Sequence, residues 1–129
     1  MIIDTNLLDT LSAQAKASPR LRMNYNLRNT PEDHSQRMLN AVEPGTMMPI
    51  HRHRDSSETV VVLRGKVRWL YYDDEGRLID SILVEANGDI RGLSVPQGQW
   101  HSLESLESGS VILKTKDGVW EALKEEDMM

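Results

Sequence analysis

The pattern of hydrophobic and polar positions changes once along the chain, near residue 20. Before that point the apolar positions recur at intervals of three and four, the spacing of one face of an α-helix. These positions are Leu7, Leu8, Leu11 and Ala15. Asp4 or Thr5 can cap the start of such a helix, and Pro19 ends it. The spacing therefore predicts a short N-terminal helix that serves packing or a dimer contact.

From residue 21 onward the pattern changes to short runs that alternate between apolar and polar residues. Met23, Tyr25 and Leu27 alternate with polar neighbours, which is typical of a β-strand. Further strands, separated by turn residues, are predicted over 36–43, 59–63, 66–72, 77–84, 89–95, 100–106 and 109–116. Arg64-Gly65 has the character of a tight hairpin turn between two of these strands. The succession predicts an all-β protein, an antiparallel jelly roll of two sheets.

Length and composition limit what the protein can be. The 129 residues suffice for one domain, in which we expect a helical segment over 1–20 and a β-barrel over 21–129. The net charge of −5 argues against nucleic acid as a partner, and the absence of cysteine excludes disulfides. The chain shows neither a signal peptide nor an apolar run long enough to span a membrane, so we expect a cytoplasmic protein.

Three of the four histidines and one glutamate form a set of metal ligands. On a strand, His51 and His53 would project from the same face about 7 Å apart. Glu58 follows closely, and His101 must arrive from a distant strand. Three imidazoles and one carboxylate suit Zn, Fe, Mn, Co or Ni. The spacing predicts one divalent metal bound by His51, His53, Glu58 and His101 inside the barrel.

The spacing of these residues resembles that of the cupin superfamily. The first cupin motif is matched by Gly45, His51, His53, Glu58 and Gly65 at the expected intervals. The centre of the second motif is matched by Pro96-Gln97-Gly98-Gln99-Trp100-His101. The resemblance implies a single-domain cupin, a double-stranded β-helix jelly roll, here preceded by the short helix.

A narrower resemblance is to the WbuC-type cupin-fold metalloproteins, small bacterial proteins associated with polysaccharide-synthesis gene clusters. It is carried by the segments Gln36-Arg37-Met38-Leu39-Asn40, Pro44-Gly45-Thr46, His51-Arg52-His53-Arg54, Glu58-Thr59 and Trp100-His101-Ser102-Leu103. Near the C-terminus the chain departs from that pattern, with Lys116-Asp117-Gly118-Val119-Trp120 in place of a Lys-x-Gly-Pro-Tyr-like segment. The resemblance bears on the fold and the metal rather than on a reaction.

Polar residues on the strands beside the first motif are candidate ligand-binding residues. Arg37 and Asn40 lie on the strand that leads to the motif, and Asn24 and Asn26 share one face of the strand before it. A cationic metal with a nearby guanidinium favours an anionic or polyhydroxylated small molecule. We also expect a homodimer, because a small jelly roll has exposed sheet edges that need protection.

Two functions remain open at this stage. The first is a metal-dependent enzyme acting on a small polar metabolite, a sugar or sugar nucleotide, by isomerisation or epimerisation, lyase chemistry or dioxygenation. The second is a non-catalytic, metal-dependent module that binds or senses a carbohydrate-like ligand. A catalytic role needs an acid or base besides Glu58, and the sequence offers no obvious one.

Overall fold

The structure is a computed structural model that describes residues 1–129 and is built mainly from β-strands. Its elements are α1 (Thr5–Ala17), β1 (Arg22–Asn26), β2 (Ser35–Val42), β3 (Glu58–Arg64), β4 (Lys66–Tyr72), β5 (Leu78–Glu85), β6 (Gly92–Val95), β7 (Trp100–Ser105), β8 (Ser110–Asp117) and the 3₁₀ helix η1 (Glu125–Asp127). No helix in the protein has the length and apolar character needed to cross a membrane.

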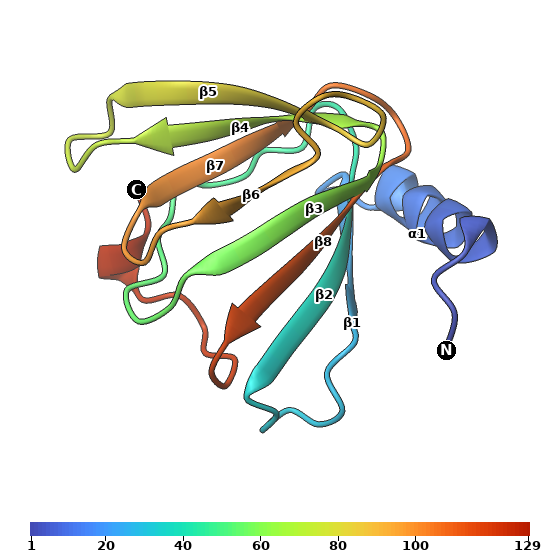
Figure 1. Ribbon diagram of the computed structural model, residues 1–129, viewed down its shortest axis with the longest axis horizontal. Coiled ribbons are helices and arrows are strands. Elements are labelled where there is room, and N and C mark those ends of the chain that lie inside the picture. The colour runs from blue at the N-terminus through green and yellow to red at the C-terminus, as the bar shows by residue number, and fades with distance from the viewer.

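The strands form two antiparallel sheets that face each other (Figure 1). One sheet has five strands in the order β1-β2-β8-β3-β6, and the other has three in the order β5-β4-β7. Valines from both sheets, together with Trp69, Leu103 and Ile112, form the core between them. This arrangement confirms the predicted all-β jelly roll.

The N-terminal helix α1 forms where the sequence predicts it and packs outside the barrel (Figure 1). Asp4 caps the helix, because its side chain accepts a hydrogen bond of 2.9 Å from the backbone N–H of Leu7. Leu11 and Ala15 are buried in a second, smaller core formed with Leu39, Ala41 and Val111. The helix thus covers the outer face of the five-stranded sheet.

The predicted hairpin at Arg64-Gly65 is wrong. The flanking strands β3 and β4 do not pair, because β3 pairs with β6 and β8 whereas β4 pairs with β5 and β7. Gly65 has a φ of +84° and carries the chain from one sheet into the other. The short connection therefore makes a corner between the layers. In contrast, the turn after β4 does join two paired strands, β4 and β5.

We expect Gly65→Ala to destabilise the protein by about 2 kcal/mol or more, because left-handed backbone and steric overlap both oppose the added methyl group. A Cβ at this position would lie 2.8 Å from the backbone Cα of Ser110 and 2.2 Å from its Oγ. Urea denaturation monitored by circular dichroism measures the change. Gly98→Ala is the matched control, since Gly98 also has a positive φ but has no atom within 4 Å of the added Cβ. Equal losses in the two variants would show that steric overlap at Ser110 contributes nothing.

The strand register divides the inner face of the five-stranded sheet into an apolar and a polar part. Val42, Ile112 and Val62 belong to the core between the sheets. Two and four residues beyond Ile112 on the same face of β8 lie Lys114, opposite Val60, and Lys116, opposite Glu58. The polar part therefore lies at one end of the barrel interior, next to the segment that carries His51 and His53.

Candidate metal centre

The His51-Arg52-His53 segment lies in the connection between β2 and β3, not on a regular strand as its spacing suggested. Its first histidine is nevertheless fixed to β7. The backbone N–H of His51 donates to the carbonyl of His101 at 3.0 Å, and the N–H of His101 donates to the carbonyl of His51 at 2.9 Å. This isolated pair of hydrogen bonds places His51 and His101 side by side.

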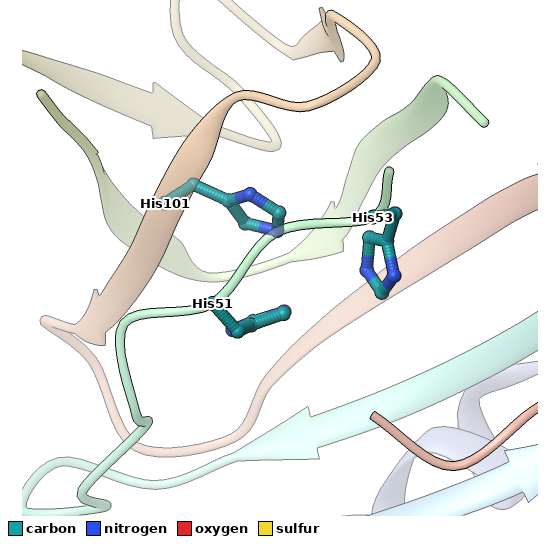
Figure 2. Close-up of side chains that lie close together, drawn as sticks. All are labelled: His51, His53 and His101. Carbon is teal, nitrogen blue, oxygen red and sulfur yellow. The ribbon is translucent and has the colours of Figure 1, made fainter. Parts of the chain in front are cut away.

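The three histidine rings converge (Figure 2). One nitrogen from each of His51, His53 and His101 lies within 4.8 Å of the corresponding atoms of the other two. The ring centroids of His51 and His101 are 4.3 Å apart, and that of His53 lies 5.2 Å from the first and 5.6 Å from the second. Trp69 from β4 stacks on His101 with a centroid distance of 5.5 Å, so the core holds this ring in place.

Hydrogen bonds to backbone carbonyls orient two of the rings. Nδ1 of His51 lies 2.9 Å from the carbonyl of Pro49, and Nδ1 of His101 lies 2.8 Å from the carbonyl of Gln99. A carbonyl only accepts, so each Nδ1 carries the proton and each Nε2 is left with a free lone pair. This arrangement is typical of metal-binding histidines. His53 differs, because its Nδ1 lies 3.3 Å from Nζ of Lys116.

Glu58, the first residue of β3, lies beside two of the histidines. Its Oε2 is 3.5 Å from Nε2 of His53, and its Oε1 is 3.6 Å from Nε2 of His101. Oε1 of Glu58 and Nε2 of His101 are both buried without a hydrogen-bond partner. Two unpartnered buried groups with lone pairs are unfavourable alone, and a cation between them would satisfy both. The donor set therefore fits a divalent metal.

The protonation states at neutral pH also suit metal binding. Burial lowers the pKa of His51 to about 3, and the neighbouring imidazole of His101 adds to the shift. Burial likewise lowers the pKa of His53 to about 4, although Glu58 opposes the shift. Burial alone would raise the pKa of Glu58, but the adjacent His101 and the charge of Lys114 outweigh it and lower the pKa to about 2. The two histidines are neutral and the glutamate is ionised, as metal ligands must be.

A cavity of about 380 Å³ adjoins these side chains and is unusually rich in cations. His51, His53 and Glu58 line it together with five basic residues: Arg20, Arg22, Arg37, Lys114 and Lys116. Sequence reasoning missed the two lysines. The signal that could have found them is the alternation of β8, which puts them on the same face as Ile112. Burial lowers the pKa of Lys116, and Glu58 partly offsets that effect.

The four predicted ligand-binding residues all line the same cavity but differ in what they offer to it. Asn24 and Asn40 face each other across β1 and β2, and their side-chain amides are hydrogen-bonded. Asn26 is exposed on β1. Arg37 shares the face of Leu39 and Ala41, which pack under α1, and its guanidinium lies 3.4 Å from the carboxylate of Asp33. Arg37 is therefore the least available of the four.

The C-terminal segment holds the histidine connection from outside. Asp127, only 7% exposed, accepts hydrogen bonds from Nε of Arg52 at 3.0 Å and of Arg54 at 2.5 Å. The backbone N–H of Arg52 donates to the Asp127 carbonyl, and that of Met129 donates to the carbonyl of Ile50. Arg52 also lies over the ring of Trp100 at 4.4 Å. The two arginines are therefore engaged by Asp127 and Trp100 rather than free.

We expect the hydrogen bonds that Asp127 accepts from Arg52 and Arg54 to weaken at low pH. Hydrogen bonds from Arg54 and then Arg52 lower the pKa of this carboxyl group, although partial burial opposes them. The contribution of the carboxylate is complete above the ordinary aspartate value of about 3.9 and is lost as the pH falls through the lowered folded-state pKa. Asp127→Asn should reproduce the acid effect at neutral pH, so hydrogen exchange at the amides of Arg52 and Met129 should become faster. Glu126→Gln, at an exposed neighbouring residue, is the control. Unchanged hydrogen exchange in Asp127→Asn would show that Asp127 does not hold this segment in place.

Solved structures with similar folds cover most of this chain. The capsular polysaccharide assembling protein CapF from Staphylococcus aureus matches with a TM-score of 0.69 and 20% identity, over 87% of this chain and 32% of its own. Oxalate oxidase in complex with the substrate analogue glycolate matches with a TM-score of 0.67 and 14% identity, over 84% of this chain and 56% of its own. Oxalate decarboxylase from Bacillus subtilis, described with its Mn(II) centres, matches with a TM-score of 0.59 and 21% identity, over 84% of this chain and 27% of its own. The chain thus spans between about a quarter and just over half of these proteins.

These likenesses, at such low identity, establish the fold. All three are cupin-fold proteins, and the two antiparallel sheets of this protein confirm the predicted cupin fold. No curated protein matches the chain. The profile of the family described as "Domain of unknown function (DUF6016)" matches residues 3–84, which include α1 and the first three predicted metal ligands. The chain belongs to this family, DUF6016, with a cupin fold.

Proposed function

We propose that this protein binds one divalent metal through His51, His53, His101 and Glu58 and acts as a metal-dependent enzyme on a small polar metabolite. The observation that carries the proposal is the pair of unpartnered buried atoms, Oε1 of Glu58 and Nε2 of His101, facing each other at 3.6 Å. The cavity beside them gives a small molecule access to the ligand set. The native metal is one of Zn, Fe, Mn, Co and Ni.

The reaction depends on what the residues around the metal can do. A divalent metal held there would polarise a bound carbonyl group and make a bound hydroxyl group or water more acidic. The carboxylate of Glu58 is ionised at neutral pH and lies next to His101, so it can serve as a metal ligand or receive a proton. Lys114 and Lys116 can orient an anionic group. Isomerisation, epimerisation and lyase chemistry would use these groups together with an acid or base on the path of the proton, whereas dioxygenation would also require O₂ and a redox-active metal such as iron.

We favour a sugar or a sugar nucleotide as the metabolite. The cations of the cavity suit phosphate or carboxylate groups, and the amides of Asn24 and Asn40 suit hydroxyl groups. The structurally similar CapF is described as assembling capsular polysaccharide, and the WbuC-type resemblance points to the same kind of metabolism. The similar oxalate oxidase is described with glycolate, a hydroxylated carboxylate.

A non-catalytic metal-dependent binding module is the second candidate. It is favoured by the shortage of acids in the cavity, whose only carboxylates are Glu58, one of the proposed ligands, and Glu121, exposed on the C-terminal segment. A proton-transfer enzyme usually has a further acid or base within reach of the bound molecule. This module would hold the same ligands without converting them.

Elemental analysis of protein purified without added metal tests the proposal first. About one equivalent of a transition metal per chain is expected, and its removal by a chelator should abolish ligand binding. A screen of sugar nucleotides by calorimetry, followed by product analysis of each binder, then separates the two candidates. Turnover that requires the metal identifies an enzyme, and binding without turnover identifies a module. Protein that neither retains nor takes up a metal would overturn both.

We also propose that the protein forms a homodimer through β5. This strand lies at the edge of the three-stranded sheet, and Leu78 and Ile79 on it are 55% and 60% exposed. Unprotected edges with apolar side chains invite pairing with another strand. Sedimentation velocity at tens of micromolar should show a dimer that Ile79→Lys converts to a monomer, with Ile90→Lys, at another exposed isoleucine outside the strands, as the control. A monomeric unsubstituted protein would remove the idea.

A further inference from the structure

Two lysines on β8 share the cavity with the proposed metal ligands. Lys114 and Lys116 occupy alternate positions of β8, on the same face as the core residue Ile112. The register sets Lys116 opposite Glu58, and both lysines line the cavity. The sheet itself therefore directs two ammonium groups toward the ligand set.

Neither lysine is neutralised by the protein. None of its ion pairs includes Lys114 or Lys116. Nζ of Lys116 lies 3.3 Å from Nδ1 of His53. The charge of Lys114 is close enough to affect His51, His53 and Glu58. The only other carboxylate of the cavity, Glu121, is exposed and not within ion-pair distance of either lysine.

This distribution of charge disfavours the binding of a metal ion without an accompanying anion. Glu58 is the single anionic group in the ligand set, so a divalent ion would leave a net positive charge next to two further cations. Like charges in a partly buried site repel strongly because water screens them poorly. An anion that contacts both the metal and the ammonium groups removes this repulsion.

We propose that Lys114 and Lys116 form an anion subsite beside the metal ligands, and that a divalent metal and a small oxyanion, carboxylate or phosphate, bind there cooperatively. The inference rests on the proposed metal site and adds the class of its ligand. Each partner supplies the charge that the other needs, so each raises the affinity of the other by the same factor.

Asn40 extends the description of the ligand. Its side chain is buried, with 5% of the residue exposed, and one of its amide atoms has no hydrogen-bond partner. Asn40 lies opposite Ile112 of β8. Lys114 follows two residues after Ile112, about 7 Å further along that strand. A hydroxyl group can donate or accept, so it satisfies this amide atom in either orientation of the amide. The ligand class is a small oxyanion that also carries a hydroxyl group.

The test measures the affinity of metal-free protein for Mn²⁺ by calorimetry. Titrations are made without anion, with glycolate, with inorganic phosphate and with ethylene glycol, and are corrected for complexes that Mn²⁺ forms in solution. Ethylene glycol is the neutral counterpart of glycolate. At least one anion should tighten Mn²⁺ binding by about fivefold or more, and ethylene glycol should not. The anion that acts distinguishes a carboxylate ligand from a phosphate ligand.

The lysine variants decide whether this coupling belongs to the subsite. Glycolate can also contact the metal directly, so the decisive quantity is the part of the coupling that Lys116→Gln and Lys114→Gln remove. In each variant, the factor by which the anion raises the Mn²⁺ affinity should fall most of the way to one. Without an anion, each variant should bind Mn²⁺ at least as tightly as the unsubstituted protein does. Lys16→Gln, on α1, is the matched control and should leave the effect intact.

Three results would overturn the inference in distinguishable ways. Mn²⁺ binding that no anion affects would refute the cooperativity and leave the metal site standing. An anion effect that persists in both lysine variants would refute the role of Lys114 and Lys116. Failure of the protein to bind either Mn²⁺ or Zn²⁺ under any condition would overturn the proposed metal site itself.

Discussion

Replacing His101 with alanine should weaken metal binding more than about 100-fold. Loss of a partner that only orients a ligand typically weakens binding about 10–100-fold, so loss of a ligand itself should exceed that range. His101 is the proposed ligand that the core holds most firmly, with 1% exposure and Trp69 stacked on its ring. Elemental analysis should give close to zero metal per chain, and calorimetry on metal-free protein gives the change in Kd.

His34→Ala is the matched control, because His34 is an exposed histidine outside the three-histidine cluster. Glu58→Gln provides a second variant in case the cavity left by His101→Ala disturbs folding. It preserves the shape of the side chain and removes its charge, so it should also reduce metal content. Unchanged metal content in His101→Ala and Glu58→Gln together would contradict the proposed ligand set.

Trp69→Ala should destabilise the protein by about 3–5 kcal/mol, the usual range for removing a large aromatic side chain from a core. Trp69 is 1% exposed, packs between the sheets and stacks on His101. Domains have total stabilities of about 5–15 kcal/mol, so this variant should be close to unfolding at room temperature. Urea denaturation at fixed metal concentration measures the loss.

Trp120→Ala is the control for that experiment. Trp120 is 51% exposed on the C-terminal segment, so its replacement should change the stability by about 0.5 kcal/mol or less. Trp69→Phe should be milder than Trp69→Ala, because it keeps a ring on His101 and removes an indole N–H that is buried without a partner. A loss below about 1 kcal/mol in Trp69→Ala would show that the sheets do not depend on this side chain.

The local elements were largely predictable because their signals are local. The helix stripe of Leu11 and Ala15 and the cap at Asp4 depend on residues close in sequence. The turn after β4 likewise joins neighbouring strands that pair. In contrast, the partners of β3 are β6 and β8, and the sequence around Gly65 carries no information about pairing with such distant strands. The same turn residues serve a hairpin and a corner between sheets.

The residue types of the candidate site were predictable from the sequence, but the backbone conformation that positions them was not. The intervals between His51, His53 and Glu58 identify the ligand types without knowledge of the fold. The prediction that His51 and His53 share a strand failed, because the connection is shaped by its contacts with β7 and with the C-terminal segment. Lys116 went unnoticed for a related reason, since its proximity to His53 arises from strand register and not from sequence spacing.

The distribution of the four proposed ligands over the two layers has a mechanical consequence. Glu58 belongs to the five-stranded sheet and His101 to the three-stranded sheet, while His51 and His53 lie on the connection between β2 and β3, where the backbone of His51 is hydrogen-bonded to that of His101. A metal held by all four would act as a cross-link between the layers at the end of the barrel opposite α1. Separating the sheets would then require breaking metal–ligand bonds. Binding of the metal would therefore raise the free energy needed to separate the two sheets. In the metal-free form, the sheets would separate transiently at that end more often.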